Sequence, residues 1–376
     1  MKIALVAHHA RPTGGQDRYL LELARHLAPR HEVHLVVVRA EGTEGMGVTV
    51  HELGIADRPM LTLAPRFARR AHAVVRNAGF DVVHAIGGSM PGATVITAQY
   101  CQAAWREARQ RYRVHEDSRL QDLYHSVVTA QAVAYERRAY AAPALRAVVA
   151  VSRGTAGELT RCYGVGAERI TVVHNGVDPV VFDRQRYPAA RADLRRSLGI
   201  APDTPLALLI GTYARKGLDT PIAATARASD TLHLAVAGAG DRALAQRWAA
   251  EAGLQGRLHL LGTRWDVAEL YAGADLFVLP TRYEPFGMVI AEAMASELPV
   301  VVSGCAGAAE LIVPGASGFV VERADDVEGF AMHLRTLLGD PALRAALGRA
   351  ARAAALDVSW ERVAVRTERV YALAAA

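Results

Sequence analysis

The chain has 376 residues, of which 51% are hydrophobic and 22% are charged, and its formal net charge at pH 7 is +5. These values exclude a disordered or fibrous protein and fit two globular domains of roughly 150 to 200 residues each. The charge is modest for this length, so it permits an anionic partner and does not imply nucleic acid.

Cysteines and apolar runs indicate the compartment. The three cysteines lie far apart and are odd in number, so they indicate neither a disulfide framework nor a zinc site. Residues 1–10 and every later apolar run are too short for a signal peptide or a membrane span. We therefore expect a cytoplasmic protein, with association at the inner face of a membrane left open.

The first half of the chain alternates short runs of valine, isoleucine and leucine with helical patterns. The predicted strands are 2–7, 33–38, 81–86, 94–98, 147–151 and 170–174. The helix after the first strand places Leu20, Leu23, Ala24 and Leu27 on one face, as packing against a sheet requires. This alternation predicts a parallel sheet covered by helices.

A helical insertion is predicted at residues 102–140, between the fourth and fifth strands. It mixes aromatic residues such as Trp105 and Tyr124 with several arginines, including Arg113. That mixture suits a membrane interface or an anionic acceptor. Acidic residues such as Glu116 and Asp117 dilute the charge, so an ordinary solvated pair of helices is the alternative.

The strand and helix alternation restarts in the second half. Predicted strands are 206–210, 232–237, 257–261, 275–279, 299–302 and 318–321. We expect two doubly wound, Rossmann-like α/β domains. The first is 1–178, joined by a C-terminal helix at 360–376; residues 179–202 form a linker, and 203–359 form the second domain.

The strongest chemical signal is the segment 281–292, which leaves a strand, turns and enters a helix. Glu284 lies in the loop at the carboxyl end of the strand, and Glu292 lies about one and a half turns into the helix. Carboxylates suit sugar and ribose hydroxyls, because each can accept two hydrogen bonds from a diol. The alternatives are a helix-capping acid and a surface residue.

Further donor-binding candidates lie around the same loop. The helix that begins there offers unpaired backbone N–H groups to a diphosphate. The candidates in this loop and after the predicted strand 257–261 are Phe286, Gly287, Met288, Val289, Thr263 and Arg264.

A second anion site is predicted at residues 211–217, after the first strand of the second domain. Arg215 and Lys216 lie there between two glycines, and Lys216 is one of only two lysines, the other being Lys2. The two cations could neutralise charge on a departing nucleoside diphosphate. A salt-bridged surface loop is the alternative.

The loop after the first strand contains Gly14 and Gly15 and opens a helix, so it also presents N–H groups to a phosphate. It lacks the G-x-G-x-x-G pattern of nicotinamide and flavin sites. The sequence contains no P-loop, no H-E-x-x-H, no G-x-S-x-G and no D-x-D pair. We therefore expect no cofactor and a metal-independent mechanism.

These motifs together resemble the retaining family-four glycosyltransferases, in which two Rossmann-like domains face each other across a cleft in the glycosyltransferase-B fold. The resemblance covers nearly the whole chain, and its most specific part is the E-x7-E pair Glu284 and Glu292. Within the family, the chain is most similar to the lipopolysaccharide core glucosyltransferase I type. The resemblance implies that Glu284 hydrogen-bonds the donor sugar, Glu292 binds the ribose, and Arg215 with Lys216 holds the diphosphate.

The resemblance also implies the reaction and its partners. It implies transfer of a hexose, with retention, from a nucleotide diphosphate sugar such as a UDP-sugar. The acceptor would be an envelope glycolipid, lipopolysaccharide or similar glycan bound by the N-terminal domain. The alternatives are transfer to a secondary metabolite and a non-catalytic peripheral membrane protein; an oxidoreductase and a sugar-nucleotide epimerase are more distant ones.

One position departs from the family. Where such enzymes commonly carry a His or Asp on the acceptor side, this chain has Gln99. A glutamine cannot act as a general base, so the donor phosphate would take the acceptor proton, or Gln99 would only orient the sugar. His84 is the candidate substitute on the acceptor side, with a structural role as its alternative.

Overall fold

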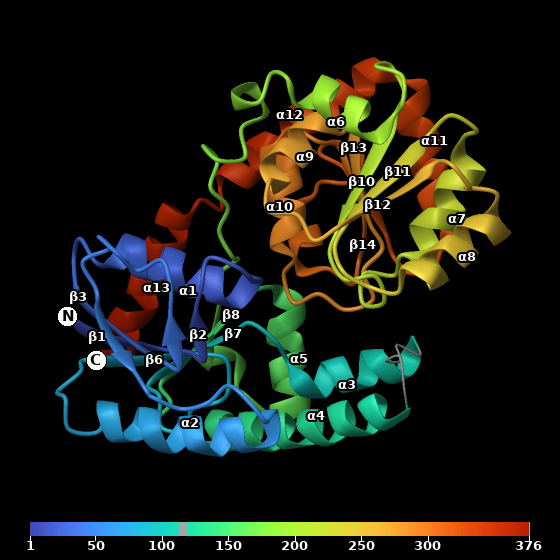
Figure 1. Cartoon of the computed structure of the whole chain (residues 1–376). Coiled ribbons are helices and arrows are strands. Elements are labelled where there is room, and N and C mark those ends of the chain that lie inside the picture. The colour runs from blue at the N-terminus through green and yellow to red at the C-terminus, as the bar shows by residue number, and fades with distance from the viewer. Residues whose placement is uncertain (113–118, 376) are drawn as a thin grey trace. The chain divides into compact units, whose positions relative to one another are not determined.

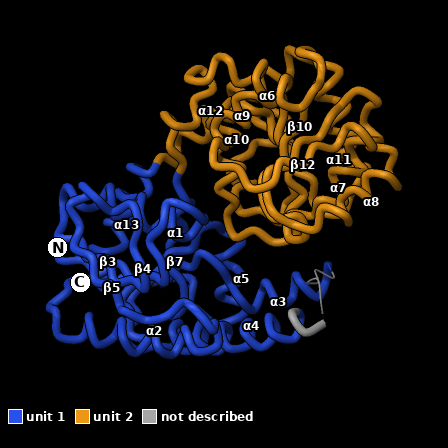
Figure 2. Tube along the Cα trace, in the orientation of Figure 1, with its two compact units in different colours: residues 1–176, 360–376 blue, residues 177–359 orange. Residues whose placement is uncertain are grey.

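The computed structural model describes residues 1–112 and 119–375; Arg113, Glu116 and Asp117 of the predicted insertion lie outside these ranges. The chain divides into two compact units (Figures 1 and 2). Unit 1 comprises Met1–Gly176 with Trp360–Ala376, and unit 2 comprises Val177–Ser359. Each unit is a parallel β-sheet with helices on its faces, as the alternating pattern predicts.

The sheet of unit 1, within the described residues, has seven strands in the order β5-β3-β1-β6-β7-β8-β9, and every pairing is parallel. The strands are β1 (Lys2–Val6), β3 (Glu32–Val37), β5 (Thr49–Glu52), β6 (Val82–Ile86), β7 (Val95–Ala98), β8 (Ala147–Ala150) and β9 (Ile170–Val172). A short ribbon pairs β2 (His9–Ala10) with β4 (Arg39–Ala40). The edge strand β5 was not predicted from the sequence, because Val50 is its only strongly apolar residue.

The helices of unit 1 are α1 (Gly15–Leu27), α2 (Met60–Val75), α3 (Gln102–Arg111), α4 (Arg119–Tyr140), α5 (Arg153–Tyr163) and α13 (Trp360–Ala375). The predicted inner face of α1 is confirmed, because its four apolar residues are fully buried. Helix α13 packs against α1, β6 and β8, where the ring of Trp360 meets Tyr19 edge-on at 5.8 Å.

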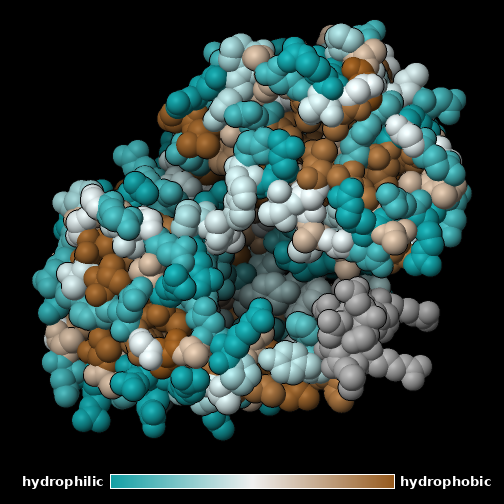
Figure 3. Space-filling model, viewed as in Figure 1, coloured by the Kyte–Doolittle hydropathy of each residue, from teal (hydrophilic) through white to brown (hydrophobic). Residues whose placement is uncertain are grey.

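Exposed apolar side chains gather on α4 and the start of α2, along the lower edge of unit 1 in Figure 3. They are Met60, Leu123, Tyr124 and Val127, which are between 38% and 62% exposed. The two helices lie side by side, and the amide of Gln131 on α4 donates to the carbonyl of Leu61 on α2 at 2.8 Å. We call these four residues the α2–α4 apolar patch.

The sheet of unit 2, in the same described ranges, has six parallel strands in the order β12-β11-β10-β13-β14-β15. They are β10 (Leu206–Ile210), β11 (His233–Ala237), β12 (Leu258–Gly262), β13 (Leu276–Leu279), β14 (Val300–Ser303) and β15 (Phe319–Val321). The helices are α6 (Ala190–Leu198), α7 (Asp219–Ala228), α8 (Arg242–Ala252), α9 (Val267–Gly273), α10 (Met288–Ala295), α11 (Val327–Gly339) and α12 (Pro341–Leu356).

The stretch 179–202, expected to be a linker, is instead part of unit 2. Its helix α6 packs on α9, and Arg195 is only 1% exposed. The guanidinium of Arg195 donates to Asp275 at 2.7 Å and to the carbonyl of Gly273 at 2.7 Å. Arg195, one of the arginines of this stretch, therefore forms a buried ion pair that anchors α6 beside the start of β13.

Each sheet has a point where the strand order reverses. In unit 1 the chain runs outward from β1 and returns to β6, and in unit 2 it runs outward from β10 to β12 and returns to β13. Helices that follow neighbouring strands diverge at such a point and leave a crevice at the carboxyl ends of the strands, where open α/β sheets bind ligands. Most of the predicted site residues lie in loops that follow these strands.

Candidate active site

The loops after β10 and β13 meet at the reversal point of unit 2. The N–H of Arg282 donates to the carbonyl of Arg215 at 3.0 Å. The guanidinium of Arg282 also bonds both carboxylate oxygens of Asp219 at 2.7 and 2.8 Å, at the start of α7. These contacts fix the two loops against each other and bring Arg215, Lys216 and Glu284 together, as the sequence reading expects of a donor site.

Lys216, Arg215 and Glu284 form the cation–glutamate cluster of unit 2. Lys216 Nζ donates to Glu284 Oε2, and Arg215 Nη1 donates to the same oxygen at 3.2 Å. The side chains of Lys216 and Glu284 are 5% and 12% exposed, while Arg215 is 30% exposed. These charges are therefore largely buried, unlike those of the salt-bridged surface loop that is the alternative prediction.

The charges of the cluster set its ionisation. Burial acts to raise the pKa of Glu284, but the nearby charges of Lys216 and Arg215 and their hydrogen bonds outweigh it and hold that pKa below its ordinary value. Burial lowers the pKa of Lys216, with Arg215 acting in the same direction and Glu284 opposing it. At neutral pH, Glu284 is therefore an ionised hydrogen-bond acceptor.

Gly211 makes room for the lysine. Its φ is +137°, and a Cβ placed on it would lie 2.6 Å from Cε of Lys216. The methylene stem of Lys216 therefore packs directly on the backbone at the end of β10. Only glycine combines this backbone conformation with the absence of a side chain.

Helix α10 places Glu292 inside the unit. Gly287 caps its N-terminus with φ 97°, and Glu292 is 3% exposed. The hydroxyl of Tyr271, on α9, donates to Glu292 Oε2 and is also 3.0 Å from the carbonyl of Val289. Glu292 is therefore held in one position by a neighbouring helix, rather than lying on the surface.

The other donor-binding candidates divide into two groups. Phe286 and Met288 are buried, at 2% and 8% exposure. Thr263 and Arg264 follow β12, the edge strand, and the guanidinium of Arg264 pairs with Asp266, with Nε to Oδ1 at 2.8 Å. This ion pair joins Arg264 to its own loop.

Unit 1 contains a pocket of about 520 Å³ at its own reversal point. We call it the unit 1 pocket. It is lined by residues of the loops after β1, β6 and β7 and by residues of helices α1, α2, α3 and α4. Gln99 lines it, and its side-chain amide exchanges two hydrogen bonds, of 3.0 and 2.9 Å, with that of Asn175.

Residues beside the predicted glycines line the same pocket. Gly14 caps α1 with φ 91°, and Gln16 and Asp17 follow Gly14 and Gly15 into the pocket wall. The sequence prediction included the two glycines but not Asp17. The position of Asp17 on the first turn of the helix that follows the first strand was the signal that could have identified it.

His84 lies in the core rather than in the pocket. It is 0% exposed, with Nδ1 at 2.6 Å from the Tyr371 hydroxyl and Nε2 at 2.7 Å from the Thr97 hydroxyl. Burial lowers the pKa of His84 to about 3. Both ring nitrogens are thus occupied between β6, β7 and α13, so the structure supports the structural alternative and His84 is not part of the proposed acceptor side.

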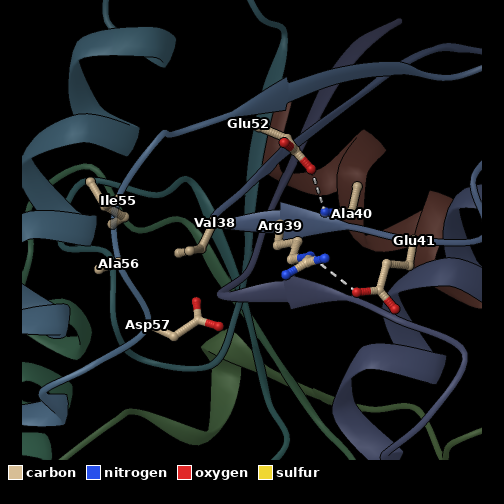
Figure 4. A pocket seen from close by; sticks show the side chains of 8 residues that line it. All are labelled: Val38, Arg39, Ala40, Glu41, Glu52, Ile55, Ala56 and Asp57. Carbon is tan, nitrogen blue, oxygen red and sulfur yellow. Dashed lines mark hydrogen bonds and ion pairs between the residues drawn. The ribbon is translucent and has the colours of Figure 1, made fainter.

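A second hollow in unit 1 lies beside β4 and β5 (Figure 4). Its polar groups bond to one another and to neighbouring residues. Glu52 accepts from the N–H of Ala40 at 2.8 Å, Arg39 pairs with Glu41 at 3.1 Å, and Asp57 accepts from Arg11 at 3.2 Å. In the described part of the chain, no group of three or more His, Cys, Asp or Glu residues is placed to hold a metal ion.

Comparisons with known proteins agree with this architecture. The model of Glycosyltransferase Family 4 matches residues 13–181, and the model of Glycosyl transferases group 1 matches residues 190–354. A D-inositol 3-phosphate glycosyltransferase from Xylanimonas cellulosilytica is 35% identical over 242 residues, which are 61% of this chain and 57% of that protein. The match therefore spans little more than half of that relative.

Solved structures show the same fold. WaaG, a glycosyltransferase involved in lipopolysaccharide biosynthesis, is similar with a TM-score of 0.77 and 23% identity, over 97% of this chain and 98% of that one. Anabaena HepE in complex with UDP-glucose is similar with a TM-score of 0.72 and 20% identity, over 98% of each chain. The chain has the two-domain glycosyltransferase-B fold. The two family models, each of which matches one part of the chain, support a family-four glycosyltransferase.

Proposed function

We propose that the protein is a retaining glycosyltransferase that moves a hexose from a UDP-sugar to a hydroxyl of a glycan, such as that of an envelope glycolipid. The observation that carries this proposal is the buried cation–glutamate cluster at the reversal point of unit 2. Lys216 and Arg215 supply positive charge for a diphosphate, and Glu284 supplies an ionised acceptor for sugar hydroxyls. The family matches and the UDP-glucose bound to HepE support the same donor class.

The proposed reaction needs charge stabilisation more than acid or base groups. The bond between the anomeric carbon and the diphosphate oxygen breaks, and its electron pair stays on that oxygen. Lys216 and Arg215 stabilise the charge that develops there. The acceptor oxygen forms the new bond on the same face of the sugar, and its proton passes to the leaving phosphate, so neither Gln99 nor a metal ion is needed.

We propose that Glu292 and the start of α10 complete the donor site. The carboxylate of Glu292, held by Tyr271, accepts hydrogen bonds from the ribose hydroxyls. The N–H of Ile290 donates to the carbonyl of Gly287, and those of Met288 and Val289, the first two of α10, can bond the diphosphate. Thr263 and Arg264 follow β12, so they lie at the carboxyl ends of the strands, as the cluster does. We propose that the base of the nucleotide extends toward them.

The acceptor side is assigned to unit 1, and membrane contact to the α2–α4 apolar patch. Among the described residues, no helix is long and apolar enough to cross a membrane. Arg69 and Arg70 are exposed on the same helix, α2, that carries Met60, and basic residues on a helix that also exposes apolar groups favour binding at an anionic lipid surface. This arrangement supports a glycolipid acceptor, taken from the inner face of a membrane.

The decisive experiment measures release of nucleoside diphosphate from a panel of nucleotide sugars, with EDTA present and no acceptor added. We expect slow release from one donor, lost in Glu284→Gln. The matched control is Glu328→Gln, because Glu328 forms exposed ion pairs with Arg335 and Arg227 on the surface of unit 2. If no donor is bound or hydrolysed, with or without added metal, the proposed activity is refuted.

A further inference from the structure

The unit 1 pocket is acidic and aromatic. Among its lining residues that the structure describes, Asp17 and Glu136 carry carboxylates and none is a lysine or an arginine. Three histidines also line it, His8, His9 and His125, and burial lowers the pKa of His8 to about 4 and lowers that of His9. Tyr100, Trp105 and Tyr135 contribute rings, and the ring centroids of Tyr100 and Trp105 are 6.2 Å apart. This lining differs in charge from the cation–glutamate cluster of unit 2.

The charge of Arg11 does not cancel the effect of burial on Asp17. Burial raises the pKa of Asp17 to about 6, and the charge of Arg11 only partly opposes this. The guanidinium of Arg11 lies 3.2 Å from Nδ1 of His9 and 3.2 Å from the carboxylate of Asp57. Above pH 6, Asp17 is therefore a negative charge on the pocket wall.

Glu136 adds a second carboxylate that is already positioned. It is 5% exposed, and it accepts hydrogen bonds from the Gln102 N–H at 2.9 Å and from the Tyr163 hydroxyl. Burial is the main cause that raises its pKa, to about 7. Near neutral pH the two carboxylates therefore add negative charge to the pocket wall, which would repel a phosphate group.

The remaining lining groups suit a hydroxylated ring. Carboxylates and the side chains of Gln16 and Gln99 exchange hydrogen bonds with hydroxyls, while the C–H face of a sugar can lie against an aromatic ring. One wall is apolar and includes Leu63 and Val128. A volume of about 520 Å³ accommodates one sugar ring together with an attached apolar group.

We propose that the acceptor group bound in the unit 1 pocket is an uncharged sugar or cyclitol ring with an apolar substituent, and that its phosphorylated counterpart is rejected. This inference rests on the proposed transferase function and names the class of its acceptor. It sets the chain apart from the Xylanimonas relative, whose name specifies inositol 3-phosphate. An envelope glycolipid fits only if the sugar that enters the pocket carries no phosphate.

The test compares acceptors that differ by one phosphate: phenyl glucoside with phenyl glucoside 6-phosphate, and inositol with inositol 3-phosphate. Transfer is measured with the donor identified from nucleoside diphosphate release, and binding is measured separately by saturation-transfer NMR. We expect the uncharged member of each pair to react and bind at least tenfold better. Equal or better use of the phosphorylated member would overturn the inference, even with an active enzyme.

Two variants connect the preference to the pocket. Ser89→Lys places a cation among the lining residues and should shift the ratio toward the phosphorylated member by tenfold or more. Trp105→Ala should lower kcat/KM for phenyl glucoside by about tenfold relative to glucose. The matched control is Trp248→Ala on α8, outside the pocket. Unchanged ratios in both pocket variants would refute the assignment.

The NMR measurement keeps this inference separate from the proposed function. If no donor is hydrolysed, the transferase proposal fails, but binding of phenyl glucoside that is lost in Trp105→Ala still supports the pocket assignment. If a donor is hydrolysed and no uncharged ring binds or reacts, the transferase proposal stands and the pocket assignment is wrong.

Discussion

Lys216 and Glu284 lie 68 positions apart in the chain, yet the lysine ammonium donates directly to a glutamate carboxylate oxygen. The loops after β10 and β13 create this contact at the reversal point of the sheet. Both side chains are nearly enclosed, so each charge depends on the other for the hydrogen bond that water would otherwise supply. A diphosphate that binds to Lys216 would share this lysine with Glu284.

Replacing Lys216 tests the role of that charge. In Lys216→Met, we expect release of nucleoside diphosphate to fall by about 10² to 10³-fold, because one cation of the leaving-group site is lost. Lys2→Met is the matched control, since Lys2 is the only other lysine and donates to a carbonyl at the edge of unit 1. Comparable rates in both variants would show that Lys216 only stabilises the fold.

Gly211 tests whether the position of Lys216 matters as well as its charge. We expect Gly211→Ala to displace the lysine stem and to reduce donor hydrolysis at least tenfold, because the new Cβ would lie 2.6 Å from Lys216 Cε. Gly253→Ala is the control: its φ is also positive, at +74°, but nothing lies within 4 Å of its Cβ. It should cost about 1 kcal/mol of stability and leave hydrolysis unchanged. Equal activity losses would point to backbone strain alone.

The strands and loops that carry the cation–glutamate cluster could be predicted from the sequence. Strand runs and loop motifs are local signals, and Glu284, Arg215 and Lys216 all follow strands whose neighbours can be ordered by the doubly wound pattern. The burial of Glu292 could not be predicted from the sequence, because it depends on Tyr271, which lies on another helix and reaches Glu292 only in the folded unit.

Sequence reading located the pocket side of unit 1 less well. Asp17 and Glu136 lie more than 100 positions apart, on α1 and α4, and only the fold brings both to one pocket. His84 is the opposite case, a residue predicted to line the acceptor side that the fold instead places in the core. Its place in the strand before the loop that lines the pocket suggested a ligand-binding histidine, whereas it lies in the middle of β6 and its ring bonds to Tyr371 of the C-terminal helix in the core.

The α2–α4 apolar patch predicts that the protein binds to membranes. We expect the protein to sediment with vesicles that contain anionic lipid, and the double variant Leu123→Ser, Val127→Ser to bind at least fivefold more weakly, because apolar area is lost from the contact. The matched control is Val313→Ser with Met332→Ser, two exposed apolar residues of unit 2. If both double variants bind like the wild type, the patch does not contact the lipid.

His84 predicts how stability depends on pH. Burial lowers its pKa to about 3 in the folded protein, against about 6.5 for an unfolded chain. Between these values the unfolded chain binds more protons, so the contribution of His84 to the free energy of unfolding is complete above pH 6.5 and is lost as the pH falls toward 3. From pH 7 to pH 5 the loss is about 2 kcal/mol.

Urea unfolding of wild type and His84→Gln at pH 5, 6, 7 and 8 checks this. The variant should be less stable at pH 7, because the hydroxyls of Tyr371 and Thr97 lose their partner, but its stability should fall about 2 kcal/mol less between pH 7 and pH 5. Tyr371→Phe keeps the buried imidazole and should retain the wild-type pH dependence. Parallel curves for wild type and His84→Gln would mean that the imidazole is protonated without unfolding, so that water reaches it in the folded unit.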